Sequence, residues 1–343
     1  MSGAPAAAHA AVPGDAVVDV HGHVYPPGYV AVVREAARGA GPHAEVARAF
    51  LDHPLVTTEP AFLGAYDRRL ALMDAARIDV QLLGFASMNV WHPDPVTRSR
   101  LVRAFNDGCA EVVAAHPDRF RFLASLPLPH VEAAVEEARR ARDLTGFAGY
   151  CIPTHIDTAA IDLPRWDPVW GALAETGSLV LLHPDGFCAR GALTDHGMEW
   201  SVGAPFEDTV VAVRLVAGGV IERFPAITWV VPHLGGTLPF LLHRLRWRWE
   251  LEARRMGASL PRAELLDRLL FDTANSSPET LRLAAQVLPP GRLVLGTDYP
   301  FVGSDDLAPS VDLVRRAVTE GLVDPGALGG LLAAVLPTLW SSP

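Results

Sequence analysis

Short apolar runs alternate with longer amphipathic stretches along most of the chain. Eight runs of five to seven residues have the length and character of buried strands. They cover residues 16–21, 79–84, 122–126, 146–152, 179–183, 227–233, 269–273 and 293–298. The stretches between them place apolar residues at helical spacing, and they cover residues 95–116, 130–143, 166–176, 206–223, 238–255 and 278–287. Strands that alternate with helices are typical of a parallel sheet, and eight such units predict an α/β fold, a single (β/α)8 TIM barrel.

Two connections in this pattern are longer than a minimal strand-to-helix loop. They cover residues 24–59, after the first strand, and residues 184–204, after the fifth. In a barrel both would lie over the C-terminal face, where active sites are built. A last helix, at about residues 326–339, is expected to pack over the outside of the barrel. Residues 1–15 lack the features of a signal peptide and are expected to form a flexible tail, so the barrel is expected to span residues 16–343.

The composition restricts the class of protein. Half of the 343 residues are hydrophobic and the formal net charge is −10, which argues against a nucleic-acid-binding surface. No apolar run is long enough to cross a bilayer, so no membrane association is expected. The three cysteines are few, odd in number and scattered, which favours a reducing cytoplasm over a disulfide framework.

All 29 basic residues, histidines aside, are arginines, and the chain contains no lysine. Schiff-base aldolases and pyridoxal-phosphate enzymes need a lysine amine, so the sequence excludes both mechanisms. A carboxylated lysine that bridges two metal ions is excluded for the same reason.

Imidazole and carboxylate side chains come at the ends of several predicted strands. His21 and His23 end the first, and because side chains alternate along a strand, they project to the same side. His183, His233 and Asp298 end the fifth, sixth and eighth. These strand ends meet on one face of a barrel, so we expect the five side chains to converge. Such ligands suit a catalytic Zn²⁺ or a similar divalent ion that keeps one position open for water.

Several short motifs follow one another in a fixed order between residue 18 and about residue 303. They are Val18-Asp-Val-His-Gly-His23, Asn106-Asp, His116-Pro-Asp-Arg-Phe120, Leu126-Pro-Leu128, Leu182-His-Pro184, Phe224-Pro, Pro232-His-Leu-Gly-Gly236 and Leu295-Gly-Thr-Asp-Tyr-Pro-Phe301. In these motifs the sequence resembles the amidohydrolase superfamily, and in particular its amidohydrolase 2 branch. That branch is typified by aminocarboxymuconate-semialdehyde decarboxylase and includes decarboxylases of aromatic acids and a hydratase.

The resemblance implies a role for each strand-end residue. One divalent metal ion would be bound by His21, His23, His183 and Asp298, and Asp298 would also carry protons. His233 would lie near the metal-bound water as an acid/base group. The intact first histidine pair favours zinc, with manganese as the alternative. Binuclear branches use a bridging lysine, which this chain lacks, so a single metal ion is expected.

This set of residues serves more than one chemistry. The leading interpretation is a mononuclear metal-dependent lyase that catalyses non-oxidative decarboxylation of an aromatic or unsaturated carboxylic acid. The alternative is a metal-dependent hydrolase that attacks an amide, a lactone or a C–C bond with metal-bound hydroxide, and a hydratase would use the same residues. A barrel that serves only as a binding module is disfavoured because every ligand and His233 are present.

Substrate binding and assembly have weaker signals. The fork of an arginine side chain suits a substrate carboxylate. The resemblance places Arg244 where the family offers an arginine across its dimer interface, and Arg190 in the second long connection is another candidate. Trp200 is expected to line an aromatic pocket. The segment that carries Arg244, Trp247 and Trp249 is typical of an interface, which predicts a homodimer or a higher homo-oligomer.

Overall fold

The computed structural model describes residues 15–58, 63, 66–86, 92–157, 159–185, 193, 195–257 and 263–335, so nearly all of the expected tail lies outside the described residues. The strands are β1 Val18–His23, β2 Val80–Gly84, β3 Phe120–Ala124, β4 Phe147–Pro153, β5 His155–Ile156, β6 Ala159–Ala160, β7 Leu179–His183, β8 Thr228–Val231, β9 Leu270–Asp272 and β10 Leu293–Val294. The α-helices are α1 Pro27–Ala37, α2 Pro42–Asp52, α3 Pro54–Thr58, α4 Tyr66–Ala76, α5 Pro95–Ala115, α6 Val131–Ala141, α7 Asp167–Ala174, α8 Ala204–Ala217, α9 Val220–Arg223, α10 Leu238–Met256, α11 Pro278–Val287, α12 Leu307–Thr319 and α13 Gly330–Val335.

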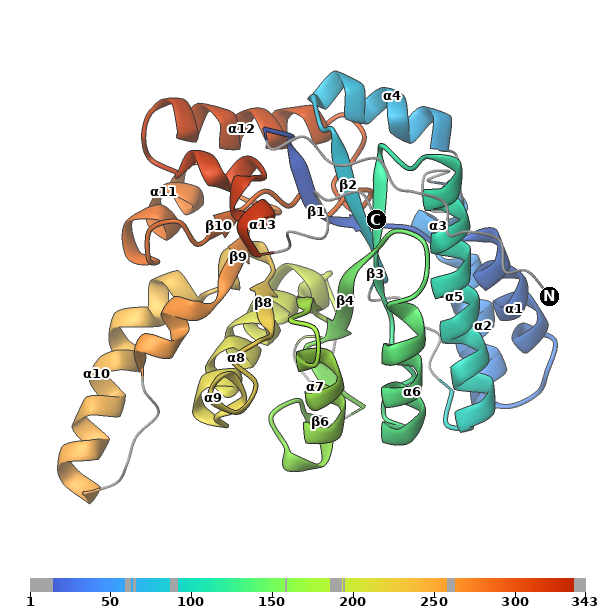
Figure 1. Cartoon of the computed structure of the whole chain (residues 1–343), viewed down its shortest axis with the longest axis horizontal. Helices are drawn as coiled ribbons and strands as arrows, with labels where there is room; N and C mark the ends of the chain where they lie inside the picture. Colours follow the sequence, from blue (N-terminus) through green and yellow to red (C-terminus); the bar gives the residue numbers. More distant parts are fainter. Residues whose placement is uncertain are drawn as a thin grey trace.

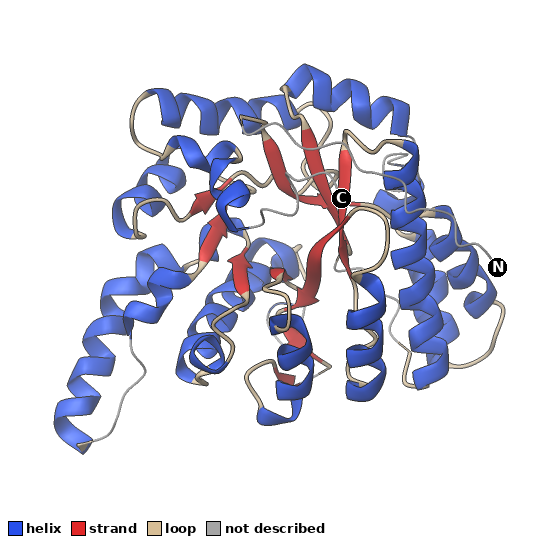
Figure 2. Cartoon of the chain, in the orientation of Figure 1, coloured by secondary structure: helices blue, strands red, loops and turns tan. Residues whose placement is uncertain are grey.

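Eight strands form one sheet in the order β1-β2-β3-β4-β7-β8-β9-β10, and every neighbouring pair is parallel. Main-chain hydrogen bonds join the two ends of this sheet. The Val20 amide donates to the Leu295 carbonyl at 2.9 Å, and the His23 amide donates to the Tyr299 carbonyl at 2.8 Å. Strands occupy the centre of the molecule, and helices surround them (Figures 1 and 2). The predicted (β/α)8 barrel is confirmed.

The predicted elements match the observed ones in order. The least regular strand is the eighth, because only β10 of residues 293–298 pairs as a strand. The predicted helix 206–223 is two helices, α8 and α9, which are separated at Gly218 and Gly219. Gly219 has φ = 70°, a conformation that ends the first helix and that glycine adopts without strain.

Two covering helices were not predicted. Helix α4 precedes β2, and α12 follows β10. In α12 the buried residues Leu307, Val311 and Val314 recur at helical spacing, so the signal is present in the sequence. The first long connection, residues 24–59, contains α1, α2 and α3.

The expected position of the last helix is wrong. Residues 325–335 form a short 3-10 helix and then α13, and the Leu332 side chain of α13 is fully buried. Leu332 belongs to the cluster inside the barrel, where it packs with strand residues such as Val18, Val80 and Leu270. Helix α13 therefore closes the N-terminal end of the barrel instead of covering its outside. The physical reason is that the barrel interior must be filled to crystal-like density, and this end would otherwise be open.

Among the described residues, no helix combines the length and apolar composition that crossing a bilayer requires.

Candidate metal centre

Four buried side chains converge at the C-terminal ends of the strands. One ligand atom from each of His21, His23, His183 and Asp298 lies within 4.8 Å of all the others. Asp298 Oδ1 is 3.0 Å from His23 Nε2, 3.4 Å from His21 Nε2 and 3.9 Å from His183 Nε2. Three imidazoles therefore surround one carboxylate oxygen, as expected for a divalent-metal site.

The outward-facing ring atoms of two histidines are fixed by hydrogen bonds. His21 Nδ1 lies 2.7 Å from Asp272 Oδ2, and His183 Nδ1 lies 2.8 Å from the Pro184 carbonyl oxygen. Both partners accept, so each ring donates from Nδ1 and, in its neutral form, presents a lone pair at Nε2. The Nε2 atoms of His21 and His183 are buried, and neither has a hydrogen-bond partner among the described residues. Two orphaned lone pairs directed at a carboxylate fit a bound cation.

An irregularity in β1 directs its histidines into the site. Strand β1 pairs with β2 with a register shift between Asp19 and Gly22. Val18 and Val20 belong to the cluster inside the barrel, and strict alternation would then turn His21 and His23 away from them. The bulge lets Val20 and His21 face the same side. Sequence reasoning placed the two histidines on one side correctly but did not include this bulge.

Gly22 in this bulge leaves room for a buried polar network. A Cβ atom on Gly22 would lie 2.6 Å from Gln81 Cδ, so any other residue would displace the Gln81 side chain. Gln81 accepts a hydrogen bond from Arg69 at 2.6 Å and donates one to Asp19 at 2.7 Å. Asp19 also accepts from the Thr297 hydroxyl at 2.6 Å. The network ties β1 to the segment that carries Asp298, and Arg69 also donates to the His23 carbonyl oxygen.

His233 lies beside the four ligands and has a carboxylate partner of its own. Its Nδ1 is 2.9 Å from Asp208 Oδ2, and its Nε2 is 3.5 Å from Asp298 Oδ2. His233 and Asp298 both have left-handed backbone conformations, with φ of 52° and 63°. Such conformations cost about 1–3 kcal/mol each and concentrate at functional sites. The nearby Gly236 packs so closely on α8 that a Cβ atom would lie 1.8 Å from the Pro205 carbonyl oxygen.

The protonation states of these groups follow from burial and charge. Burial lowers the pKa of His23 to about 3 and also lowers that of His183, so both are neutral at pH 7, the form that binds metal. Burial acts to raise the pKa of Asp298, but the surrounding imidazoles hold it well below its usual value. Burial also acts to lower the pKa of His233, but Asp208 raises it well above the usual value. His233 is thus suited to hold a proton next to Asp298.

The structure describes two of the three residues predicted to bind substrate. Arg244 is exposed on α10 and forms no ion pair with a described residue. Trp200 is 44% exposed in the turn before α8. Arg190 lies outside the described residues.

Four residues that the sequence analysis did not single out support the site. Asp272 holds His21, Asp208 holds His233, Arg69 anchors the buried network, and Asn275 donates to Asp298 Oδ2 at 2.9 Å. Asp272 is next to last in the predicted strand 269–273 and ends β9, so attention to strand ends, which identified the histidines, would have found it. Asp208 and Arg69 lie within helices, where the sequence gives no such signal.

A small cavity opens beside His183. Its volume is about 20 Å³, enough for one water molecule, and Asp185 is the acidic residue among the described residues that line it. Burial raises the pKa of Asp185 to about 7, although Arg98 acts to lower it. A perturbed carboxyl group beside a metal ligand is typical of a functional site.

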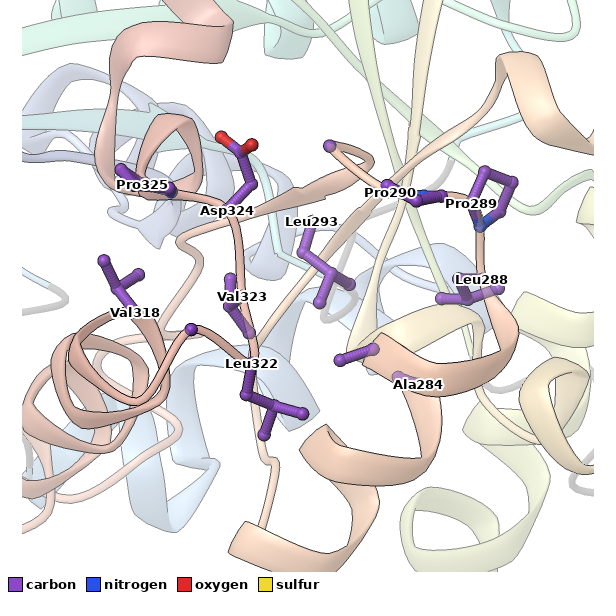
Figure 3. A pocket seen from close by; sticks show the side chains of 13 residues that line it. Ala284, Leu288, Pro289, Pro290, Leu293, Val318, Leu322, Val323, Asp324 and Pro325 are labelled. Atoms are coloured by element: carbon purple, nitrogen blue, oxygen red, sulfur yellow. The ribbon is translucent and has the colours of Figure 1, made fainter.

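Figure 3 shows a second cavity, of about 450 Å³, at the other end of the barrel. Apolar side chains such as Leu288, Leu293 and Leu322 line it, and its one acidic residue, Asp324, accepts a hydrogen bond from the Gly326 amide at 2.7 Å. None of the four converging metal-ligand candidates lies there. The converging side chains, and not the size of a cavity, therefore identify the candidate site.

Comparison with known proteins agrees with this geometry. The amidohydrolase family model matches residues 18–326. The chain belongs to the amidohydrolase family. A gamma-resorcylate decarboxylase from Rhodococcus jostii is 30% identical over 263 residues, which cover 70% of this chain and 78% of that protein. The 2-amino-3-carboxymuconate-6-semialdehyde decarboxylase of Dictyostelium discoideum is 26% identical over 68% of this chain and 66% of its own length.

A solved structure extends the likeness over nearly the whole chain. The crystal structure of 5-carboxyvanillate decarboxylase from Sphingomonas paucimobilis superposes with a TM-score of 0.80 and 27% identity. The match covers 94% of this amidohydrolase and 99% of that chain.

Proposed function

We propose that this amidohydrolase is a mononuclear metal-dependent decarboxylase of aromatic or unsaturated carboxylic acids. The observation that carries the proposal is the position of Asp298. Its Oδ1 faces the Nε2 atoms of the three proposed ligand histidines, and its Oδ2 lies 3.5 Å from His233 Nε2. One carboxylate thus connects a cation-binding cluster to a residue that holds a proton. The decarboxylase names of the relatives support the same reading.

The proposed ligands are His21, His23, His183 and Asp298. A divalent ion held there would polarise an oxygen of the substrate next to the bond that breaks. In decarboxylation, the bond between the carboxylate and a carbon of the ring or alkene breaks, and its electron pair stays on that carbon. The carbon then takes a proton and carbon dioxide leaves. His233, charged through its contact with Asp208, is the proposed proton source, and Asp298 is the neighbour through which the proton passes.

We propose zinc as the native metal. Three neutral imidazoles and one carboxylate form a donor set that zinc binds well, and manganese accepts the same set less tightly. Elemental analysis of protein purified without added metal distinguishes the two.

We also propose that the molecule is a homodimer or a higher oligomer through α10. This helix projects away from the barrel (Figure 1), and its Phe240 and Trp247 side chains are 78% and 47% exposed. Exposed aromatic side chains next to arginines are typical of interfaces. In the dimer, Arg244 would hold a substrate carboxylate, with Arg190 as the second candidate and Trp200 as part of the aromatic wall.

The localisation proposal is cytoplasmic, on the basis of the cysteines. Cys109 and Cys151, the two cysteines that the structure describes, are buried free thiols.

The first experiment measures metal content and carbon dioxide release together. We expect about one equivalent of metal per chain, its loss in His183→Ala, and carbon dioxide release from at least one hydroxybenzoic acid by the wild type. Metal with no decarboxylation of any acid, but hydrolysis of an amide or lactone, would favour the hydrolase alternative. Protein that folds and binds no divalent metal would contradict the proposal.

A further inference from the structure

The cavity beside His183 combines apolar lining residues with a carboxyl group. Its lining includes Phe85, Ala86, Pro153 and Pro184, and among the described residues that line it Asp185 is the one acidic side chain. With a volume of about 20 Å³, the cavity can take a substituent the size of a water molecule, such as a hydroxyl or amino group, but not a ring. Asp185 is therefore placed to recognise a substituent of whatever lies next to the metal ligands.

The position of Asp185 is set by its backbone. The Asp185 amide donates to Glu207 Oε2 at 3.0 Å, and the same oxygen accepts from the Thr154 hydroxyl at 2.8 Å. Glu207 is buried at the start of α8, and Thr154 directly follows β4. Three elements thus hold the residue in place before any ligand binds, which is the arrangement that a selective site needs.

The side chain of Asp185, in contrast, is not held by the part of the fold that the structure describes. Its carboxyl oxygens form no hydrogen bond or ion pair with a described residue, although the group is partly buried. A partly buried carboxylate without a donor has a cost, because it has given up water without replacing it. A ligand that supplies the donor would remove this cost.

We propose that Asp185 is a specificity-determining residue that accepts a hydrogen bond from a hydroxyl or amino substituent of the substrate. In its ionised form the carboxyl group only accepts, so a donor is favoured and a methyl group leaves it unpaired. Glu207 and Glu199 add negative charge near Asp185, and among the described residues Arg98 is the positive side chain that acts on it. A second substrate carboxylate would thus meet like charge. The substrate class is an aromatic monocarboxylic acid that carries a second donor group.

This inference rests on the proposed function, and its test uses matched pairs of acids. The 2,3-, 2,4-, 2,5- and 2,6-dihydroxybenzoates are each compared with the 2-hydroxybenzoate that carries a methyl group in place of the second hydroxyl. Metal-loaded wild type, Asp185→Asn and Asp185→Ala are assayed for kcat/KM by carbon dioxide release and for Kd by calorimetry. Asp195→Asn removes the same charge from a side chain that is 66% exposed, and it serves as the control.

In at least one pair we expect the wild-type kcat/KM to be at least tenfold higher for the dihydroxy acid than for the methyl acid. In Asp185→Ala we expect this ratio to fall below threefold. Asp185→Asn, which keeps an acceptor oxygen, should lose less preference, and the control should keep all of it. Equal loss for both acids of every pair would show a structural role and overturn the inference. So would a wild-type preference for the methyl acid or for an acid with a second carboxylate. If no acid is decarboxylated, the proposed function fails. The ratio of the Kd values within each pair then still tests the role of Asp185. If none of the acids binds, the inference about Asp185 is overturned as well.

Discussion

The contact between His21 and Asp272 is the support of the metal centre that can be tested most sharply. Asp272 Oδ2 is 2.7 Å from His21 Nδ1, and its Oδ1 accepts from the amides of His233 and Ala274 at 2.9 and 3.0 Å. In Asp272→Asn the amide oxygen would keep the two backbone donors, so the amide nitrogen would face His21. The ring would then have to accept at Nδ1 and carry its proton on Nε2, where the metal binds.

The magnitude follows from the loss of one well-oriented ligand. Changing the partner of a metal-bound histidine typically weakens metal binding by about 10–100-fold, which is about 1.4–2.7 kcal/mol. The apparent Kd for Zn²⁺ is measured at pH 7 by competition with a chelating dye, and circular dichroism checks the fold. We expect the variant to fold and its Kd to rise within that range.

Asp208→Asn is the matched control. Asp208 contacts His233, which is not a proposed ligand, at 2.9 Å, and its other oxygen has no hydrogen-bond partner among the described residues. Its replacement should leave the Kd for Zn²⁺ within about twofold of the wild-type value while decarboxylation slows, since general acid–base groups contribute about 10²–10⁴-fold. If Asp272→Asn binds zinc as tightly as the wild type, or if both variants lose it equally, the assignment of the two carboxylates is wrong.

Three further predictions test the fold around the site. Leu332→Ala opens a cavity where α13 closes the barrel and should cost about 2–5 kcal/mol of unfolding free energy in urea. Leu283→Ala, at a position that is 38% exposed, should cost far less unfolding free energy. Equal losses in the two variants would contradict the role of α13 in closing the barrel. Gly22→Ala forces Gln81 out of its network and should lower metal content, and full metal occupancy would refute this. Arg139 of α6 and Arg142, which follows it, hydrogen-bond Glu175 and lower its pKa to about 2. Glu175→Gln should therefore reduce the unfolding temperature above about pH 4.5 and lose that effect as the pH falls toward 2. A difference in unfolding temperature between wild type and Glu175→Gln that grows as the pH falls would refute this prediction.

The barrel and the converging side chains could be predicted because both depend on strand ends. The rule that parallel strands deliver their carboxyl ends to one face needs only the pattern of apolar runs, and it brought His21, His183 and Asp298 together correctly. The bulge at Asp19–Gly22 could not be predicted in this way, because it lies where Gly22 packs against the Gln81 side chain of a neighbouring strand. Local sequence does not report a contact of that range.

The position of α13 failed for a related reason. Leu331 and Leu332 are apolar in either location, and only the size of the barrel interior decides which side receives them. Asp208 is similar, because a carboxylate on an amphipathic helix normally faces water, but here it is fully buried against His233. Both features depend on packing between elements far apart in the chain.

The metal cluster and the determinant of substrate choice depend on different parts of the barrel. His21, His23 and Asp298 lie at the seam where the first and last strands meet, and main-chain hydrogen bonds join the seam there. Any change that shifts β1 against this last segment moves three proposed ligands at once, which restricts the seam sequence to residues such as Gly22. Asp185 lies two residues beyond the fourth proposed ligand, His183, on a turn held by one side chain of α8. Substitutions there change what the cavity accepts without moving the seam, so one metal site can serve acids with different substituents.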